Sequence, residues 1–449
     1  MKNKWLIILL VASFFKGLIW LFFTPIFQIP DEPSHFAYVQ FLAEENRRPH
    51  PRREVVTSQE LFSVSQIVNF NWKIEHPVWQ GYPKNWLGKI KSINPEAKKE
   101  FIANPYLTSL KRPGLYYSAA AQIYRLLANQ SFLWQFFSVR FFSLICQLIT
   151  IWLVYLISIK LTKKSWLSLA AAAGVSFHPG FSFILNGVSY EALGVLAATL
   201  FIYLAVNKGK IIWLLLTALV GILIKPDLIF LWLLLPFCLP KKPRIIIIGS
   251  LVLSFIGFIW LNPVINQVVR GQYSWLDRYL YVVPLKDYAD YANQLIQLLS
   301  NGQIFYKTIE YVQIFIRVHY HQIFAWYWGV FGWLEKTMPI GVYSGLKILT
   351  LLSFFGLIQV WPKAKWLVLA VLIQAGVVIA NDFLVFSQTG QLYGIQGRYF
   401  YPAIAAQMIL FVWGLSRWVK PGYLVAGAVG LNLIGLFSLY QYFGWVWGS

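Results

Sequence analysis

Long apolar runs are the feature that most constrains this chain. Segments of roughly 18 to 25 mostly apolar residues recur along it, and each is long enough to cross a bilayer as a helix. Of its residues, 58% are hydrophobic and only 12% are charged. A backbone in lipid must satisfy its own hydrogen bonds, which a helix does within itself. The sequence therefore predicts an all-α polytopic membrane protein, organised as a single integral-membrane domain over residues 1–449.

We expect about 11 transmembrane helices from the positions of these runs and of two shorter ones at 211–224 and 226–239. The predicted ranges are 5–24, 134–159, 165–183, 189–206, 211–224, 226–239, 245–261, 341–361, 366–383, 399–416 and 421–445. The first run is longer than the apolar part of a signal peptide, and no small-residue cleavage site follows it. We therefore expect that run to remain as a helix.

The charges between the runs orient the chain. The short gaps that carry only positive charge hold Lys2 and Lys4, Lys160 to Lys164, Lys208 and Lys210, Lys241 to Arg244, Lys363 and Lys365, and Arg417 and Lys420. None of the 17 Asp and Glu residues lies in them. Positively charged short loops face the cytoplasm, which predicts a cytoplasmic N-terminus and an extracytoplasmic C-terminus. The net charge of +21 then reflects membrane orientation, so the expected partner is the lipid bilayer and not a nucleic acid.

Two segments are too long to be simple connectors. They cover about 25–133 and 262–340, and we expect both to be extracytoplasmic loops that carry short interfacial helices. Residues 113–127 are half apolar, but a span there would place Lys160 to Lys164 outside. That piece is therefore interpreted as an interfacial or re-entrant helix.

An acidic pair follows the first predicted span, in Pro30-Asp31-Glu32-Pro33-Ser34-His35. Two adjacent carboxylates can divide labour, one accepting a proton while the other holds a metal or a sugar hydroxyl. His35 lies four residues after Asp31 and would share its face on a helix. The alternative is a carboxylate cap at a helix N-terminus, and the two roles are compatible.

Glu191 and Lys225 are charged residues at the ends of predicted spans. A carboxylate at membrane depth usually lines a polar cavity, which makes Glu191 a candidate substrate contact. The alternative is a helix cap, with Ser189 supplying the cap oxygen. For Lys225 the alternative is a local ion pair with Asp227, which contributes little if exposed.

Two arginines lie near predicted outer ends of spans. An arginine can donate two hydrogen bonds to one phosphate. Arg398 and the adjacent Tyr399 are therefore candidate substrate contacts. Arginine at a bilayer surface also extends to lipid phosphates. That alternative is open for Arg398 and is preferred for Arg140.

A divalent metal is a further hypothesis, with Asp31, His319 and His321 as candidate ligands and His35 nearby. Histidines at i and i+2 do not share a helix face, so such a site requires irregular backbone. Lys16 lies in the middle of the first span and is expected to face the bundle interior. The sequence assigns it no role.

Several short motifs occur in a fixed order along the chain. They are Pro-Asp-Glu-Pro-x-His at 30–35, Arg112-Pro113-Gly114-Leu115-Tyr116-Tyr117, Gly329-Val330-Phe331-Gly332-Trp333 and Gly397-Arg398-Tyr399-Phe400-x-Pro402. This series resembles a bacterial family of predicted multi-pass membrane proteins of unknown function, domain-of-unknown-function family 2142. That family is grouped with the GT-C superfamily of integral-membrane glycosyltransferases. Two departures are Gly114, where relatives have a second proline, and Val188-Ser189-Tyr190-Glu191, where they usually have Asn-x-x-Asp.

The resemblance implies a GT-C-like fold in a bacterial plasma (inner) membrane, with a polyprenyl-phosphate-linked sugar as donor. It places Asp31 and Glu32 at the acidic pair that takes part in catalysis or metal binding. It also makes Arg112 and Tyr116 candidate substrate contacts.

The sequence and the resemblance together predict a membrane glycosyltransferase. It would move a sugar to a cell-envelope acceptor on the extracytoplasmic face, with Asp31 as general base and Glu32 or His35 orienting the acceptor or a metal. The alternatives are a multi-pass transporter or lipid flippase, and a membrane scaffold without catalysis. The transferase hypothesis requires Asp31 and Arg398 to share one cleft.

Overall fold

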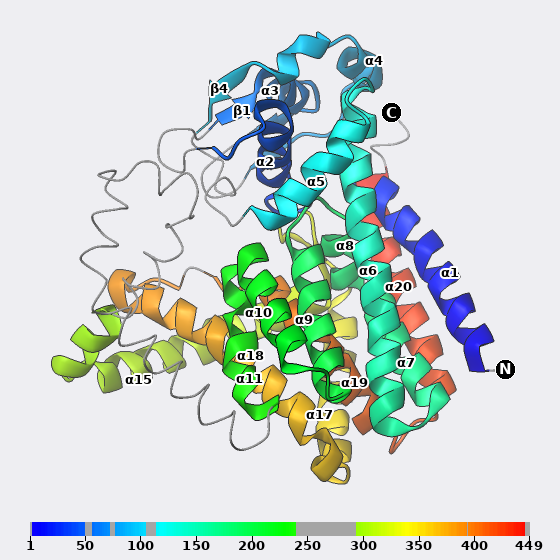
Figure 1. Cartoon of the computed structure of the whole chain (residues 1–449), viewed down its shortest axis with the longest axis vertical. Coiled ribbons are helices and arrows are strands. Elements are labelled where there is room, and N and C mark those ends of the chain that lie inside the picture. The colour runs from blue at the N-terminus through cyan, green and yellow to red at the C-terminus, as the bar shows by residue number, and fades with distance from the viewer. Residues whose placement is uncertain are drawn as a thin grey trace.

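The chain is mostly helical, with several long helices side by side, another crossing them obliquely, and a smaller unit at one end (Figure 1). The computed structural model describes residues 2–49, 56–71, 77–104, 114–238, 293–392 and 394–444. Within them the strands are only two or three residues long, which confirms the predicted all-α class. The predicted span 245–261 lies outside the described residues.

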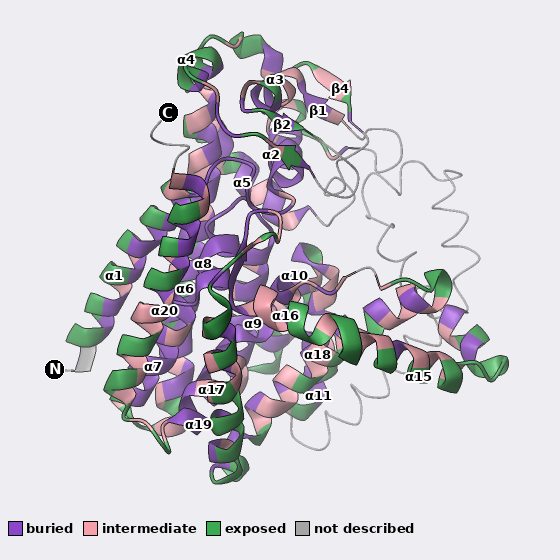
Figure 2. Ribbon diagram, turned by 180° about the vertical axis from the view of Figure 1, so that it is seen from behind, coloured by how far each residue is buried: buried purple, intermediate pink, exposed green. Residues whose placement is uncertain are grey.

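Five helices in the described residues are long and apolar enough to cross a membrane, judged by length and composition. They belong to α1 (Lys2–Phe23), α6 (Phe132–Thr162), α17 (Ile340–Ile358), α18 (Trp361–Thr389) and α20 (Pro421–Phe443). Large apolar side chains such as Phe15, Phe354 and Phe437 are exposed on them. Figure 2 shows exposed residues along α1 and α17, as expected of helices that face lipid.

The predicted span 165–183 is not one straight helix, which corrects the prediction. It consists of α7 (Ser165–Ser176) and α8 (Pro179–Leu185), bent by 57°. Pro179 has no N–H to continue the helix, and a residue before proline is pushed to extended backbone. His178 accordingly has φ −67° and ψ 117°. If this pair is one broken span, the candidates in the described residues number up to six.

Four other predicted spans form shorter helices. They comprise α9 (Glu191–Val206), α10 (Ile211–Ile224), the 3₁₀ turn η3 (Pro226–Ile229), α11 (Phe230–Cys238), the 3₁₀ segment η6 (Gly397–Ala403) and α19 (Ile404–Leu415). The count of about 11 transmembrane helices therefore stays a prediction.

The first long segment folds into the smaller unit beside the ends of α1 and α6 (Figure 1). Its elements are α2 (Glu32–Glu45), β1 (Val56–Ser58), α3 (Gln59–Ile67), β2 (Phe70–Asn71), β3 (Val78–Trp79), α4 (Trp86–Lys91), η1 (Pro95–Lys98), β4 (Phe101–Ala103) and α5 (Leu115–Leu126). The strands pair antiparallel, β1 with β4 and β2 with β3. Phe36, Leu61, Val64, Tyr124 and Phe136 belong to its apolar core.

The described part of the second long segment lies against the helix bundle. It holds α15 (Ile304–Ile314), the π-helical turn η5 (Phe315–His319), α16 (Tyr320–Gly329), β5 (Val330–Phe331) and β6 (Lys336–Thr337). The strands β5 and β6 pair antiparallel. Helix α16 packs against α8 and η6, so this segment adjoins the motif that contains Arg398.

Polar contacts inside the bundle stabilise the bend between α7 and α8. Lys16 of α1 is buried, as expected, and its Nζ donates to the carbonyl oxygen of Ser176 at 2.6 Å and to Ser182 Oγ at 2.9 Å. From α20, Asn432 donates to the carbonyl oxygen of Phe177 at 3.1 Å. Carbonyl groups freed at the bend thus find donors on two neighbouring helices.

Helices α1 and α20 lie beside each other, with Trp20 Nε1 donating to Asn432 Oδ1 at 3.2 Å. Both run towards the smaller unit and end next to it (Figure 1). The side of the membrane that each end faces stays a prediction.

Candidate active site

A fully buried ion pair fixes the chain between α1 and α2. Arg140 of α6 donates from Nε to Glu32 Oε1 at 2.8 Å and from Nη2 to Oε2 at 2.6 Å. Its guanidinium also donates to the carbonyl oxygens of Leu21, Thr24 and Pro25. Both charged side chains are 0% exposed. The expectation that Arg140 extends to lipid phosphate is therefore wrong, because the fold surrounds it with acceptors.

Glu32 also connects this loop to the turn between α8 and α9. Its carboxylate accepts from the backbone N–H groups of Phe27 at 3.1 Å and Val188 at 3.0 Å. Gly187 allows the close approach, since a Cβ there would lie 2.5 Å from Ile29 Cδ1 and 3.1 Å from Glu32 Oε1. Glu32 is thus enclosed by protein, and its neighbour Asp31 is the member of the pair that solvent reaches.

Asp31 and Arg398 form an ion pair across 367 positions of sequence. Nη2 of Arg398 bonds to Asp31 Oδ2, and Nη1 donates to the carbonyl oxygen of Pro30 at 3.0 Å. The Arg398 side chain is 7% exposed, whereas that of Asp31 is 38% exposed. Asp31 precedes α2 with φ 65°, a left-handed conformation that aspartate tolerates. The Asp31 side chain caps no backbone N–H of α2 among the described residues.

A second pair lies beside the first. Lys225 Nζ contacts Glu191 Oε1 at 2.7 Å and Asp227 Oδ2 at 3.2 Å. The side chains of Lys225 and Glu191 are each 2% exposed, while that of Asp227 is 34% exposed. The local pair of Lys225 with Asp227 is therefore present, but Glu191 is the closer partner. The ring of Tyr399 contacts both Lys225 and Arg398, so the two pairs belong to one cluster.

Aromatic rings connect the charged groups. The ring centroid of Tyr399 lies 5.1 Å from Lys225 Nζ and 5.6 Å from Arg398 Cζ. Tyr190 contacts Lys225 at 5.6 Å and meets the ring of His35 edge to face at 4.9 Å. Such faces attract cations. We define the site cluster as Asp31, His35, Tyr190, Glu191, Lys225, Asp227, Arg398 and Tyr399.

Two buried polar atoms of this cluster have no hydrogen-bond partner within the described part of the chain. They are Arg398 Nε, a donor, and Glu191 Oε2, an acceptor. Buried polar groups are normally paired, and an unpaired one costs about 1–3 kcal/mol or more when charged. One unpaired donor and one unpaired acceptor therefore suit a ligand that carries both an anionic group and a hydroxyl.

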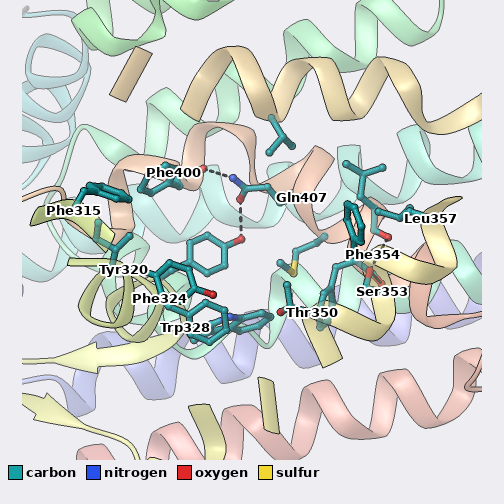
Figure 3. A pocket seen from close by; sticks show the side chains of 16 residues that line it. Phe315, Tyr320, Phe324, Trp328, Thr350, Ser353, Phe354, Leu357, Phe400 and Gln407 are labelled. Atoms are coloured by element: carbon teal, nitrogen blue, oxygen red, sulfur yellow. Dashed lines mark hydrogen bonds between the residues drawn. The ribbon is translucent and has the colours of Figure 1, made fainter. Parts of the chain in front are cut away.

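An apolar cavity of about 400 Å³ adjoins the segment that carries Arg398. Phe400, two residues after Arg398, lines it together with residues of α16, α17, α18 and α19 (Figure 3). Gln407 joins two of its walls, accepting from Tyr327 Oη at 2.8 Å and donating to the carbonyl oxygen of Phe400 at 3.0 Å. Its lining includes Phe315, Phe324, Trp328, Phe354, Leu357 and Phe411. The cavity suits a hydrocarbon chain.

The remaining candidates from the sequence lie elsewhere or are enclosed. Tyr116 is fully buried, and its hydroxyl accepts from the backbone N–H of Ser189 at 3.1 Å. It therefore supports the turn that leads to Glu191. Arg112 lies outside the described residues.

The histidines named as metal candidates are not gathered around Asp31. His319 ends η5, and His321 of α16 bonds to Lys347 Nζ at 2.8 Å. In the residues described, no group of three or more His, Cys, Asp and Glu side chains is arranged to hold a metal. A divalent metal at Asp31 stays a hypothesis.

Tyr190 belongs to the cluster and Tyr117 contacts it, although the sequence analysis named neither as a substrate contact. The hydroxyl of Tyr117 lies 2.7 Å from His35 Nδ1 and fixes the ring next to Asp31. Tyr117 belongs to the 112–117 motif and Tyr190 precedes Glu191. Their positions in or beside named motifs were the only sequence signal that these tyrosines could lie at the site. Whether each ring faces the site depends on the rotation of the helix that carries it.

Comparison with solved structures finds the crystal structure of ArnT from Cupriavidus metallidurans bound to undecaprenyl phosphate, with a TM-score of 0.39 and 13% identity. The match covers 97% of this chain and 63% of that chain. This chain therefore spans less than two thirds of that protein's length. Comparison with curated proteins finds no match.

A family model described as "Predicted membrane protein (DUF2142)" matches residues 14–406. The match begins within α1 and ends within α19, so it includes the whole site cluster. The chain therefore belongs to this family of predicted membrane proteins.

Proposed function

We propose that this protein is a membrane glycosyltransferase. It moves a sugar from a polyprenyl-phosphate donor to a cell-envelope acceptor on the extracytoplasmic face. The observation that carries the proposal is the meeting of Asp31 and Arg398, which combines a solvent-accessible carboxylate with a buried guanidinium. The family's resemblance to GT-C glycosyltransferases supports the same chemistry.

The donor phosphate binds the Nε and Nη2 edge of Arg398 in this proposal. The Nε and Nη2 groups can donate two parallel hydrogen bonds, and a phosphate can accept both of them with two of its oxygens. Nε is unpaired among the described residues and Nη2 is held by Asp31. The phosphate therefore replaces Asp31 at Nη2. The donor's isoprenoid tail enters the apolar cavity beside Phe400.

Displacement from Arg398 frees Asp31 to act as a base. A carboxylate paired with a guanidinium is a weak base because its charged form is stabilised, and loss of the partner raises its basicity. The acceptor hydroxyl oxygen attacks the anomeric carbon while its proton moves to Asp31. The bond from that carbon to the phosphate oxygen breaks, and its electron pair leaves with the polyprenyl phosphate. Arg398 stabilises the charge on this leaving group.

The other named residues take supporting roles. His35, held by Tyr117, orients the acceptor next to Asp31. Lys225 lies in the same cluster and adds positive charge near the phosphate, with Tyr399 between it and Arg398. Glu32 holds the loop and contacts no substrate in this scheme, because it is enclosed by Arg140 and backbone N–H groups.

Transfer from defined donors tests the proposal. Purified protein is incubated with radiolabelled undecaprenyl-phosphate hexoses and a membrane extract, and label in the acceptor fraction is counted. Asp31→Asn removes the base and should lower the rate by about 10²- to 10⁴-fold. The control is Glu45→Gln, which removes a partly exposed carboxylate at the far end of α2. Transfer by Asp31→Asn at the wild-type rate would refute the assigned role.

One observation favours a transporter or lipid flippase instead. The break between α7 and α8, with Lys16 donating to it, is of a kind that transporters use at substrate sites. Proteoliposomes distinguish the two functions, because a flippase moves fluorescent polyprenyl phosphate between leaflets without forming a glycosidic bond. Lipid movement without sugar transfer would favour this second function.

A further inference from the structure

The Glu191 carboxylate uses only one of its two oxygens. Oε1 accepts from Lys225 Nζ at 2.7 Å, and Oε2 is buried without a hydrogen-bond partner in the described residues. The residue is 1% exposed. A desolvated carboxylate oxygen is a strong acceptor that normally finds a donor.

Helix capping does not account for this oxygen. Glu191 is the first residue of α9, where a negative charge is favourable. However, Ser189 Oγ already accepts the Glu191 backbone N–H at 3.2 Å. The helix end therefore explains why an acidic residue is tolerated, but it leaves the second carboxylate oxygen unused.

We propose that Glu191 Oε2 accepts a hydrogen bond from a sugar hydroxyl, which makes Glu191 a specificity-determining residue of the site. This inference rests on the proposed glycosyltransferase function. A hydroxyl is favoured over a second cation because the buried Lys225 ammonium, 2.7 Å from Oε1, already neutralises Glu191, while Asp227 is 34% exposed to solvent. A phosphate oxygen is disfavoured because a carboxylate repels it. Arg398 lies in the same cluster, because the Tyr399 ring contacts both Arg398 Cζ at 5.6 Å and Lys225 Nζ at 5.1 Å, and Lys225 bonds to Glu191.

The hydroxyl belongs either to the transferred sugar or to the acceptor. Binding of two lipids to the full-length protein in detergent separates these sources. One lipid is bare undecaprenyl phosphate and the other is undecaprenyl phosphate carrying glucose, galactose or mannose, tested one at a time. The variant is Glu191→Gln, which keeps the side-chain shape and leaves Lys225 beside Asp227.

If the transferred sugar supplies the hydroxyl, Glu191→Gln weakens binding of a glycosylated lipid by about tenfold, since a hydrogen bond to a charged acceptor becomes a neutral one. Binding of the bare lipid stays unchanged. If the acceptor supplies it, both lipids bind as before and the KM for acceptor rises by a similar factor. Either result supports the hydroxyl site.

Unchanged binding of both lipids together with an unchanged acceptor KM overturns the inference. Failure of the wild-type protein to bind bare undecaprenyl phosphate counts against the proposed function itself, which the inference requires. Glu191→Asp guards against misfolding, because it keeps a charge for Lys225 but shortens the side chain by one methylene. It should show the same selective loss. Glu96→Gln, an exposed carboxylate in the first long segment, is the matched control.

Discussion

At the scale of single residues, the charged groups differ in whether a substrate can reach them. Glu32 and Arg140 are enclosed, with five hydrogen bonds from the guanidinium to acceptors within the protein. Asp31 is one residue away, yet 38% of its side chain is exposed. Adjacent carboxylates thus differ in accessibility, because Glu32 pairs with Arg140 of α6 and Asp31 pairs with Arg398 of η6.

The buried pair predicts an asymmetric mutational response. Arg140→Met leaves Glu32 charged and unpaired, which should lower the free energy of unfolding by about 3–5 kcal/mol. The double variant Arg140→Met with Glu32→Gln should lose less than the two single variants together, because it leaves no unpaired buried charge. Thermal unfolding in detergent measures these differences.

The exposed pair of Lys99 and Glu96 provides the control, since its atoms also lie 2.8 Å apart. Lys99→Met should have little measurable effect, as water already solvates both groups. Equal and additive losses for the buried and exposed pairs would contradict the structural role of Arg140.

At the scale of elements, a buried polar cluster joins three helices of the first long segment. Glu60 of α3 accepts from Gln40 of α2 at 2.7 Å, and the same amide donates to Tyr124 of α5 at 3.2 Å. Burial raises the pKa of Glu60 from 4.5 to about 7, although the hydrogen bond from Gln40 opposes the shift. The folded state therefore holds a proton that the unfolded state has already released at mildly acidic pH.

This cluster predicts a pH dependence of stability. Between pH 4.5 and about 7 the native state binds more protons than the unfolded state, so the free energy of unfolding falls as pH rises. The contribution of Glu60 is fully present below pH 4.5 and is lost by about pH 7, at a scale of roughly 3 kcal/mol.

Unfolding of wild type and Glu60→Gln across this range isolates the effect from other carboxyl groups. The variant cannot titrate at this position, so its stability should decline less with pH. Parallel curves for the two proteins would show that Glu60 has an ordinary pKa.

At the scale of the whole molecule, the charged cluster and the apolar cavity meet at η6. Arg398 and Tyr399 face the cluster, while Phe400 lines the cavity. Helix α16 packs against the same segment, and Gly397 permits this contact, because a Cβ there would lie 2.1 Å from Tyr327 N. A lipid with a charged head and an apolar tail matches this arrangement.

Filling the cavity should weaken binding of a long-chain lipid. Val371 lines the cavity from α18, and Val371→Phe should reduce affinity for undecaprenyl phosphate by about tenfold, which corresponds to roughly 1.4 kcal/mol. A short-chain prenyl phosphate should bind as it does to wild type, because its head group uses Arg398 and its tail does not extend through the cavity.

Leu372→Phe is the matched control, since the adjacent Leu372 is 62% exposed and does not line the cavity. Isothermal titration in detergent measures all three proteins. If Val371→Phe and Leu372→Phe bind the long-chain lipid equally, the cavity does not hold the tail.

The sequence by itself determined the helical class and the positions of most apolar helices, because hydrophobic runs and the hydrogen-bonding demands of a membrane act locally along the chain. It also named Asp31, Glu191, Lys225 and Arg398 as candidates, since charged residues at the ends of apolar runs are few. Pro179 was visible in the sequence, yet the bend before it was not predicted.

Only the tertiary structure decided which charges pair. Arg140 meets Glu32 across 108 positions and Arg398 meets Asp31 across 367, and these contacts depend on how α6 and η6 pack against the loop after α1. Helix rotation likewise decided that Tyr117 and Tyr190 face His35. Long-range packing brings these side chains together, and no local pattern of residues specifies it.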